Sequence, residues 1–542
     1  MAMTFVDYVF IILFVGAVLG VSFFKSREKK DSASYFLAGR GATWWLVGFS
    51  LIAANISTEQ FVGMSGAGAG NVGLAIASYE WIAAVTLVFV AIFFLPRFLS
   101  AGIYTIPEYL EYRYNATART IMSLFLMVVY VCVTIVAVVY SGGLTIHTIF
   151  GWPLVTSIWI IGVLAAAYTT FGGLKAVIWA DLIQGSALIV GGAVVLFFGL
   201  RAMTPEGGLI AGWGAFMEEA GDKMHMSLPN DHASLPFTAL LFGIWIPNFY
   251  YWGLNQYITQ RTLASKSLSE GQKGILFAAF LKLLIPFIIV IPGIMAWILY
   301  SDELGGVESA ARDAAYPLLI RNLVPVGLRG FMLAALAGAV MSSLASMLNS
   351  ASTIFTMDLF KRHLRPDASE NQLVLVGRSS TVVFVVVGCL IAPMLANPRF
   401  GGVFNYIQDL QGFISPGILT AFVFGLIIKR TPPAAAIAAM VANVPIYGIL
   451  HFSWVQTVVV RLVPFLGSMD ANGVGNVAFL NQMAITATCL TIVMAIVTAI
   501  KPLEKPVIMP VNKDFDMRYS PVVPAAGTAI ILATMVLYYI FW

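Results

Sequence analysis

The sequence predicts an all-α protein that crosses a membrane many times. Of its 542 residues 59% are hydrophobic and only 10% are charged, whereas soluble domains carry roughly 25% charged residues. Apolar runs recur from end to end, each about 18 to 25 residues long and therefore able to cross about 30 Å of hydrocarbon. Hydropathy predicts about 14 membrane helices, centred near residues 14, 52, 86, 130, 163, 189, 246, 286, 340, 385, 416, 441, 487 and 532.

The loop charges predict which side of the membrane each loop faces. If the N-terminus is outside, the loops on the opposite side hold most of the Lys and Arg residues, as the positive-inside rule requires. Both termini are then outside the cytoplasm, and the number of helices is even. The first apolar run is followed, not preceded, by basic residues, the reverse of a cleavable signal, so we expect it to be retained as a lipid-facing accessory helix.

The stretch Ser50–Met64 is apolar enough to enter a bilayer but carries five polar residues in its middle, namely Asn55, Ser57, Thr58, Glu59 and Gln60. Such groups are expensive in hydrocarbon unless they face a protein-lined or water-filled cavity. The run therefore predicts an interrupted helix whose freed backbone groups bind something. The glycine-rich residues 63–73 that follow fit equally well a flexible loop or a segment lining a vestibule.

Two further charges lie at membrane depth. Glu80 has apolar flanks in the next helix, which favours a functional carboxylate. Lys282 has about ten apolar residues on either side, so we expect it to pair with a carboxylate or to contact a substrate. Asp181 follows a predicted turn at Thr169–Leu174, and it is either a helix-start carboxylate or part of an ion route.

A second interrupted helix is expected at about 237–257. Pro247 and Gly253 should break it, and Asn248 is polar at membrane depth. It lies five spans after the first interruption and enters the membrane in the opposite direction, which predicts two inverted five-helix repeats. The expected layout is an accessory helix and loop at 1–42, a first repeat at 43–200, an outer loop at 201–236, a second repeat at 237–451 and accessory helices at 452–542.

Other polar residues fit more than one interpretation. Serines 342, 343, 346 and 350 in one helix are typical of close helix packing, which leaves ion binding by particular hydroxyls open. Gln408, Asp409 and Gln411 mark a further polar interruption. The outer-loop histidines and the three cysteines lack metal-ligand spacing, and the cysteines predict no disulfide framework.

Several motifs resemble those of a known family. SLIAANISTEQFVGMSG, GLAIASYEW, YYWGLNQYITQRTLASKS, FAAFLKL, SSLASMLNS and YIQ followed by SPGIL are similar to those of the sodium:solute symporter family, within it the bacterial sodium/galactose and animal sodium/glucose cotransporter type. The resemblance covers nearly the whole chain. It implies the leucine-transporter fold, alternating access, a bacterial inner (cell) membrane location, and sodium and sugar sites near the bilayer midplane.

The resemblance also implies roles for individual residues. It places sugar ligands at Gln60, Glu80, Asn248, Lys282 and Gln408, an inner gate at Tyr251, and outer-gate residues at Met64, Tyr79 and Phe404. It implies sodium ligands at Ala53, Ile56 and Ala339 through their carbonyls and at Ser342 and Ser343 through their hydroxyls, with Asp181 near a sodium exit route. Ala83 stands where the family's sugar transporter has a serine, which leaves the sugar's identity open.

The chemistry of these side chains agrees with the resemblance. A sugar presents hydroxyls that both donate and accept hydrogen bonds, and amides, a carboxylate and an ammonium can pair with them. Tyr251 offers an aromatic face, and sodium prefers oxygen ligands. We therefore expect sodium-coupled import of a neutral sugar such as galactose or glucose, with an acidic sugar, an amino acid or a vitamin as the alternative solute. Since the sequence has neither a channel filter nor an HExxH or GxSxG motif, an ion channel and an enzyme are disfavoured. A homo-oligomer is left open.

Overall fold

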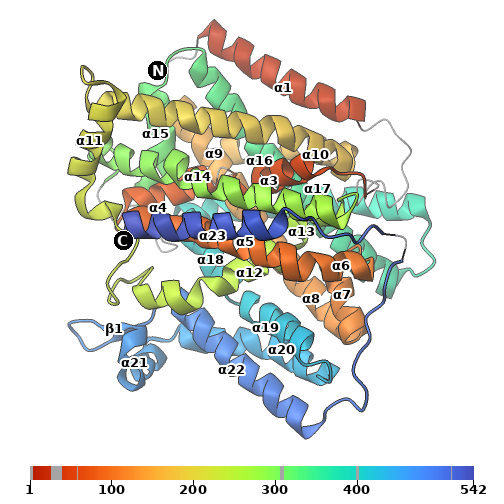
Figure 1. Ribbon diagram of the computed structural model, residues 1–542. Coiled ribbons are helices and arrows are strands. Elements are labelled where there is room, and N and C mark those ends of the chain that lie inside the picture. Colours follow the sequence, from red (N-terminus) through yellow and green to blue (C-terminus); the bar gives the residue numbers. More distant parts are fainter. Residues whose placement is uncertain (1–3, 26–39, 58, 306–309, 398–401, 514) are drawn as a thin grey trace.

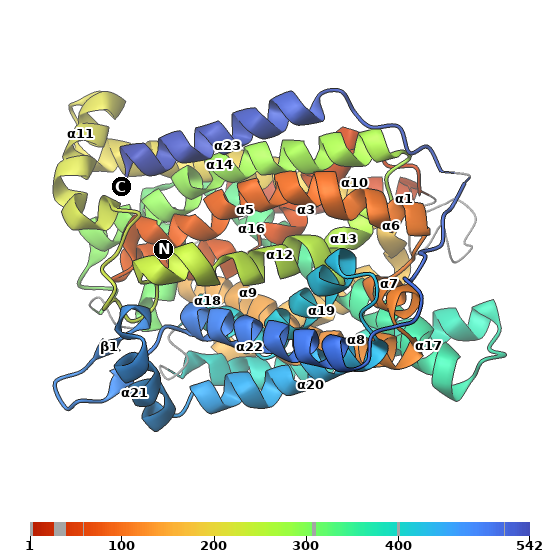
Figure 2. The same cartoon turned by 60° about the horizontal axis from the view of Figure 1, so that its bottom comes forward.

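The chain folds into a bundle of helices in the computed structural model shown in Figures 1 and 2. The structure describes residues 4–25, 40–57, 59–305, 310–397, 402–513 and 515–542. Within this part, the only strands are the two-residue pair β1 (Ser468–Met469) and β2 (Gly475–Asn476), which are antiparallel. Both views place the C-terminal end of α23 at the end of the bundle that carries α11.

The first half of the chain supplies the following helical elements. They are α1 (Phe5–Lys25), α3 (Trp44–Asn55), η2 (Gln60–Met64), α4 (Ser65–Ala69), η3 (Gly73–Ala77), α5 (Ser78–Phe89), η4 (Val90–Phe94), α6 (Leu95–Ala101), α7 (Ile106–Arg113), α8 (Ala116–Val129), η5 (Tyr130–Thr134), α9 (Ile135–Phe150), α10 (Leu154–Met203), α11 (Gly208–Ala220) and η6 (Gly221–Met224).

The second half continues in the same all-helical manner. Its elements are η7 (Ala239–Gly243), α12 (Trp245–Leu254), α13 (Gln256–Leu263), α14 (Leu268–Tyr300), η8 (Ala310–Ala314), α15 (Ala315–Leu323), α16 (Leu328–Thr353), η9 (Ile354–Leu364), α17 (Glu370–Ile391), η10 (Ala392–Ala396), α18 (Val403–Gln411), α19 (Ser415–Ile427), α20 (Pro433–Leu450), α21 (Ser453–Leu462), η12 (Pro464–Leu466), α22 (Phe479–Ile500) and α23 (Val523–Ile540).

Nine helices in the described residues are long and apolar enough to cross a membrane, and the bent pair α18 and α19 makes up to ten. Three of the remaining predicted centres fall on shorter apolar helices, at Phe5–Val18, Trp44–Asn55 and Leu154–Ala166. The last, near residue 246, falls on the broken segment that contains α12 and α13. The all-α membrane fold is confirmed, but length and composition do not confirm the count of 14.

The first interrupted helix is present where it was expected. Helix α3 ends at Asn55, and helical structure resumes at Gln60. The polar residue Thr58 lies outside the described part of the chain. The glycine-rich segment after the break is not a flexible loop, since residues 65–69 form α4 and most of them are buried. The close packing requires a glycine at position 66, because a Cβ there would lie 2.7 Å from an Asp313 carboxylate oxygen.

The second interruption is also present, but at a different residue. Asn255 has an extended backbone between α12 and α13, whereas the expected break at Pro247–Gly253 is wrong. Pro247 lies near the start of α12, where a missing N–H leaves no bond unmade. Gly253 is helical, and a Cβ there would lie 2.4 Å from the ring of Phe94. This glycine therefore serves close packing.

Helices α18 and α19 form the third break and are bent by 46° relative to each other. Pro416 lies in the first turn of α19, where proline fixes a helical φ and lacks only an N–H that would be unbonded there. Asn443 of α20 donates from Nδ2 to the carbonyl of Gly412, at 3.2 Å, and to that of Phe413. The backbone groups at this break therefore keep partners inside the protein.

One expectation about neighbouring helices is wrong, and a second is refined. Residues 154–203 form one continuous helix, so Thr169–Leu174 is not a turn. Gly172 and Gly173 each weaken a helix by only about 1 kcal/mol, and the stretch has no proline. Helix α1 is mostly exposed, as expected of a lipid-facing helix, but its Asp7 is buried against the start of α16. Its carboxylate accepts hydrogen bonds from the backbone of Gly327 at 2.8 Å and Gly330 at 3.0 Å and pairs with Arg329 at 2.9 Å.

Candidate substrate and ion sites

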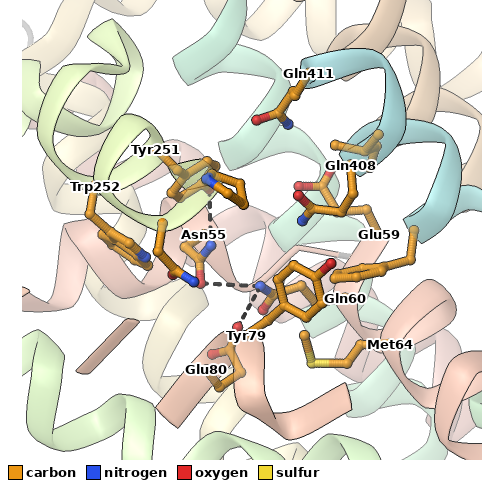
Figure 3. A pocket seen from close by; sticks show the side chains of 14 residues that line it. Asn55, Glu59, Gln60, Met64, Tyr79, Glu80, Tyr251, Trp252, Gln408 and Gln411 are labelled. Carbon is orange, nitrogen blue, oxygen red and sulfur yellow. Dashed lines mark hydrogen bonds between the residues drawn. The ribbon is translucent and has the colours of Figure 1, made fainter. Parts of the chain in front are cut away.

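The three broken helices border one pocket (Figure 3). The first break and the start of α5 supply one part of its wall, and α12 and α18 supply the rest. The lining residues are Asn55, Glu59, Gln60, Met64, Tyr79, Glu80, Pro247, Asn248, Tyr251, Trp252, Phe404, Ile407, Gln408 and Gln411. The structure thus brings together all the predicted sugar ligands and gate residues except Lys282, which lies behind this wall.

Lys282 is buried and forms an ion pair with Glu80 through Oε2 of the carboxylate. Its Nζ also donates to Asn55 Oδ1 and lies 4.9 Å from the ring centroid of Trp252. A buried charge without a partner is strongly destabilising, whereas two opposite buried charges in contact compensate each other. The expected carboxylate partner of Lys282 is therefore Glu80, and Lys282 touches the pocket wall through Glu80 and Asn55.

Amide side chains extend this ion pair across the pocket. Gln60 donates from Nε2 to Glu80 Oε1 at 3.0 Å and to Asn55 Oδ1 at 3.3 Å. Asn55 in turn donates to the Tyr251 hydroxyl at 2.9 Å, as the dashed lines in Figure 3 show. The Tyr251 hydroxyl also accepts a hydrogen bond from Tyr257 at 2.5 Å. This chain of bonds fixes the polar side chains before any solute arrives.

Aromatic residues form the apolar part of the wall. Tyr79 and Phe404 pack edge to face with their ring centroids 4.9 Å apart, and both are buried. Met64, the third predicted outer-gate residue, is completely buried beside the pocket. Figure 3 shows Tyr251 and Trp252 on the other side of the cavity from Met64. The polar groups of the pocket are thus enclosed between two apolar sides.

A second polar cluster surrounds Asp181, which is completely buried in α10. One carboxylate oxygen accepts a hydrogen bond from Ser342 of α16. The other accepts from Ser50 of α3 at 2.5 Å and from the Arg261 guanidinium of α13 at 3.1 Å. Asp181 is therefore not a helix-start carboxylate, since α10 begins at Leu154. It joins helices from both predicted repeats.

The predicted sodium ligands lie at this same junction. Ser57 N donates to Asn55 O at 3.0 Å, so the Ala53 carbonyl lacks its usual helical donor. Gln60 N donates to Ser57 O at 3.0 Å, which likewise releases the Ile56 carbonyl. Ser343 Oγ donates to Ala54 O at 3.4 Å and so connects α16 to this break. Ala339 and Ser342 lie within one turn of Ser343 on α16.

The sequence assigned no ligand or gate role to several residues that line the pocket. Glu59, Trp252 and Gln411 are among them, and Asn55 turned out to be a hub of the hydrogen-bond network. A signal existed for most of them, because each lies in one of the polar interruptions. Which residues of an interruption point inward depends on how the chain turns after the helix ends, and hydropathy does not contain that information.

Helices broken at membrane depth around a buried polar pocket are typical of secondary membrane transporters, and the likeness to a solved symporter given below shows the leucine-transporter fold of two inverted five-helix repeats. Residues 35–442 match the sodium:solute symporter family, and the chain belongs to it. It is 46% identical over 469 residues to the sodium/glucose cotransporter of Vibrio parahaemolyticus, covering 83% of this chain and 86% of that protein.

Other relatives agree with this membership. The human sodium/myo-inositol cotransporter 2 is 35% identical over 466 residues, which cover 81% of this chain and 68% of that protein. Among solved structures, a substrate-bound outward-open Na⁺-coupled sialic acid symporter superimposes with a TM-score of 0.75. It is 23% identical, and the match covers 93% of this chain and 99% of that one. This last likeness shows the fold.

Proposed function

We propose that the protein imports a neutral sugar, such as galactose or glucose, by alternating access, driven by the sodium ion that its family co-transports. The observation that carries this proposal is the pocket itself, in which amides, a paired carboxylate and a tyrosine ring face one buried cavity between broken helices. Similarity to the sodium/glucose cotransporter of Vibrio parahaemolyticus supports the choice of solute.

In this proposal the sugar hydroxyls bond to Gln60, Glu80, Asn248 and Gln408. Each hydroxyl donates and accepts, so a set of amides and a carboxylate satisfies it from both sides. Lys282 orients Glu80 through their ion pair, and the sugar reaches Lys282 only when this pair rearranges. The ring of Tyr251 takes the apolar C–H face of the sugar.

The sodium site proposed here consists of the carbonyls of Ala53, Ile56 and Ala339 and the hydroxyls of Ser342 and Ser343. Two of these carbonyls have lost their helical donors, and Ser343 already reaches the break from α16. A hard cation prefers such oxygens. Sodium bound here would join α3 to α16, and Asp181, one hydrogen bond away through Ser342, would lie beside the exit route.

Alternating access requires the two apolar sides of the pocket to open in turn. We assign Met64, Tyr79 and Phe404 to the outer gate and Tyr251 to the inner gate. Tyr251 suits this role because its hydroxyl accepts hydrogen bonds from Asn55 and from Tyr257. Asn55 lies at the first chain break, and Tyr257 lies just after the second one. Rotating Tyr251 would release the link between the first and second broken helices.

The orientation and the domain layout belong to the same proposal. The C-terminus lies beside the loop at 201–236, since Met226 N donates to Phe541 O at 2.8 Å. Asp7 lies beside the turn before α16, a loop assigned to the same side. This arrangement supports two termini on one face, assigned to the outside, and repeats at 43–200 and 237–451 between accessory segments 1–42 and 452–542.

The test is uptake of labelled solutes into proteoliposomes that contain the purified protein. An inward sodium gradient should drive accumulation of galactose or glucose, and potassium should not replace sodium. The same panel should include an acidic sugar, an amino acid and a vitamin as the alternative solutes. Accumulation of one of these and not of a hexose would contradict the solute assignment, and equal uptake on a proton gradient in sodium-free buffer would contradict sodium coupling.

A further inference from the structure

A second cavity, of about 550 Å³, shares no lining residue with the pocket between the broken helices. Residues of α5, η4, α6, α12, α19 and α22 form its wall. The lining is apolar apart from Arg97 and two threonines, Thr420 and Thr491. Phe93 and Ile427 of this wall are 46% and 74% exposed. The cavity is therefore a groove on the outside of the bundle, where the acyl chains of a membrane would surround it.

The length of the groove matches one leaflet of a bilayer. Its wall extends from Phe89 to Arg97 along one segment and from Leu419 to Ile427 along another, which is about 12 Å of helix in each case. One leaflet contributes about 15 Å of hydrocarbon. An empty apolar groove forfeits the dispersion contacts of its lining, and an acyl chain would restore them. The groove is thus suited to hold the chain of one lipid.

The connection from α22 to α23 forms the rim of this groove on the side that the proposed orientation makes cytoplasmic. Leu503 N donates to Arg430 O at 2.9 Å just after α19, and Asn512 N donates to Ser100 O of α6 at 2.6 Å. Residues 503–512 therefore join the ends of two helices that line the groove. In Figures 1 and 2 this connection passes α6 and α7 at the end of the bundle opposite α11.

The charges around this end of the groove are mostly positive. Five exposed basic side chains lie there, namely Arg97, Lys429, Arg430, Lys501 and Lys505. None of the five forms an ion pair within the part of the chain that the structure describes, and one acidic residue, Glu504, accompanies them. Clusters of four to eight basic residues just cytoplasmic of a membrane helix are typical of sites for anionic lipid headgroups.

Arg97 connects the apolar groove to the basic rim, because it lines the groove and is exposed at the same time. Its guanidinium donates to the carbonyl of Phe93 in the preceding turn, which uses one of its five N–H donors. A phosphate group accepts strong, charge-assisted hydrogen bonds from the remaining donors of an arginine in such a position.

We infer that this groove is a binding site for an anionic phospholipid of the cytoplasmic leaflet. The acyl chain lies against Phe249 and Val423, and the phosphate lies beside Arg97 and the basic rim. Phe249 follows Asn248 in α12, so the lipid contacts a helix that also borders the solute pocket. The inference does not depend on which solute the protein carries.

Another apolar groove, of about 400 Å³ between α3, α14 and α23, offers a matched control. Lys273 is the charged residue of its wall, and it pairs with Glu270 at 3.3 Å. Because this lysine is already compensated, the control groove should accept acyl chains without preferring an anionic headgroup. Lys273→Gln is therefore the control for Arg97→Gln.

The experiment measures, by native mass spectrometry of the full chain in a neutral detergent, the dissociation constants of the first phosphatidylglycerol and of the first phosphatidylcholine bound. Each basic residue at a membrane surface strengthens the binding of an anionic lipid by about fivefold. The wild type should therefore prefer phosphatidylglycerol by about tenfold or more, and Arg97→Gln should lose about fivefold of this preference.

Lys273→Gln should keep the preference of the wild type. The double variant Lys429→Gln, Arg430→Gln changes two exposed residues after α19 and should lose at least as much of the preference as Arg97→Gln does. No preference in the wild type, equal losses in Arg97→Gln and Lys273→Gln, or a full preference in both Arg97→Gln and the double variant would overturn the inference.

A further pair of variants tests the apolar part of the site without changing a charge. Val423→Trp fills the groove and should weaken the binding of phosphatidylglycerol by about tenfold or more, because the acyl chain loses its apolar contacts. Val444→Trp is the control, since Val444 is exposed on α20 outside the groove. Wild-type affinity in Val423→Trp, or equal losses in both variants, would show that the chain lies elsewhere.

Two other occupants of the groove are distinguished in the same spectra. An excess of inorganic phosphate should leave phosphatidylglycerol bound, because phosphate has no acyl chain, and its displacement would show that the rim binds simple anions and not lipid. If Arg97→Gln or Val423→Trp converts a dimer into a monomer, the groove is an interface between two copies of the chain, and the lipid site is wrong.

Discussion

The ion pair between Glu80 and Lys282 gives the sharpest test of how the pocket is held. We consider Glu80→Gln, Lys282→Met and the double variant. In the structure Lys282 contacts Glu80 and Asn55, and both charged side chains are almost fully buried. Removing one partner of a buried pair typically costs about 3–5 kcal/mol, because the remaining charge is left without compensation. Each single variant should lose about that much of the free energy of unfolding and should also lose sugar uptake.

The double variant carries no unpaired charge, so its loss should be about 2–3 kcal/mol smaller than the sum of the two single losses. The free energy of unfolding is measured by titration with sodium dodecyl sulfate, and sugar affinity by sodium-driven uptake. Arg518→Met serves as the control, because its ion pair with Asp516 is exposed. If the single losses add within about 0.5 kcal/mol, or if both single variants keep wild-type sugar affinity, the coupling argument is wrong.

Three further predictions follow from the same contacts. Ser343→Ala deletes one proposed sodium ligand and should raise the sodium concentration for half-maximal uptake by about tenfold, whereas Ser157→Ala, whose hydroxyl bonds within its own helix, should not; an unchanged sodium dependence would refute the ligand set. Tyr251→Phe should weaken sugar uptake by about fivefold to tenfold, because it loses bonds to Asn55 and Tyr257. The control variant Tyr250→Phe should change sugar uptake little, since the Tyr250 hydroxyl has no hydrogen-bond partner in the described residues. Equal losses of uptake in the two variants would contradict the gate role of Tyr251. Burial raises the pKa of Asp313, in the loop segment η8, to about 7. The folded state therefore favours the protonated acid, and the stability that this group contributes at low pH is lost as the pH rises from about 4 to about 7. Asp313→Asn should flatten the pH dependence of the unfolding temperature in that range, and an unaltered profile would show that another group is responsible.

The sequence by itself determined the class of structure and most of the chemistry. Hydropathy alone predicts a multi-span helical protein, because only helices satisfy every backbone group within one segment in hydrocarbon. The polar run after Ala54 predicts the first broken helix for the same reason, since such groups are retained only beside a cavity. Glu80 and Lys282 could be paired in advance, because isolated charges are too expensive at that depth.

Only the tertiary structure decided where the chain breaks and which side chains meet. The break falls at Asn255 and not at Pro247 or Gly253, because packing against Phe94 keeps Gly253 helical and the start of α12 tolerates a proline. The sequence also allowed Asp181 to be a carboxylate at the start of a helix, whereas contacts from α3, α13 and α16 bury it. Glu59 looks like any other polar residue of its run until the direction of the chain after Asn55 turns it into the pocket. These outcomes depend on contacts between segments far apart in the sequence, whereas hydropathy and spacing report only on the segment in which they are read.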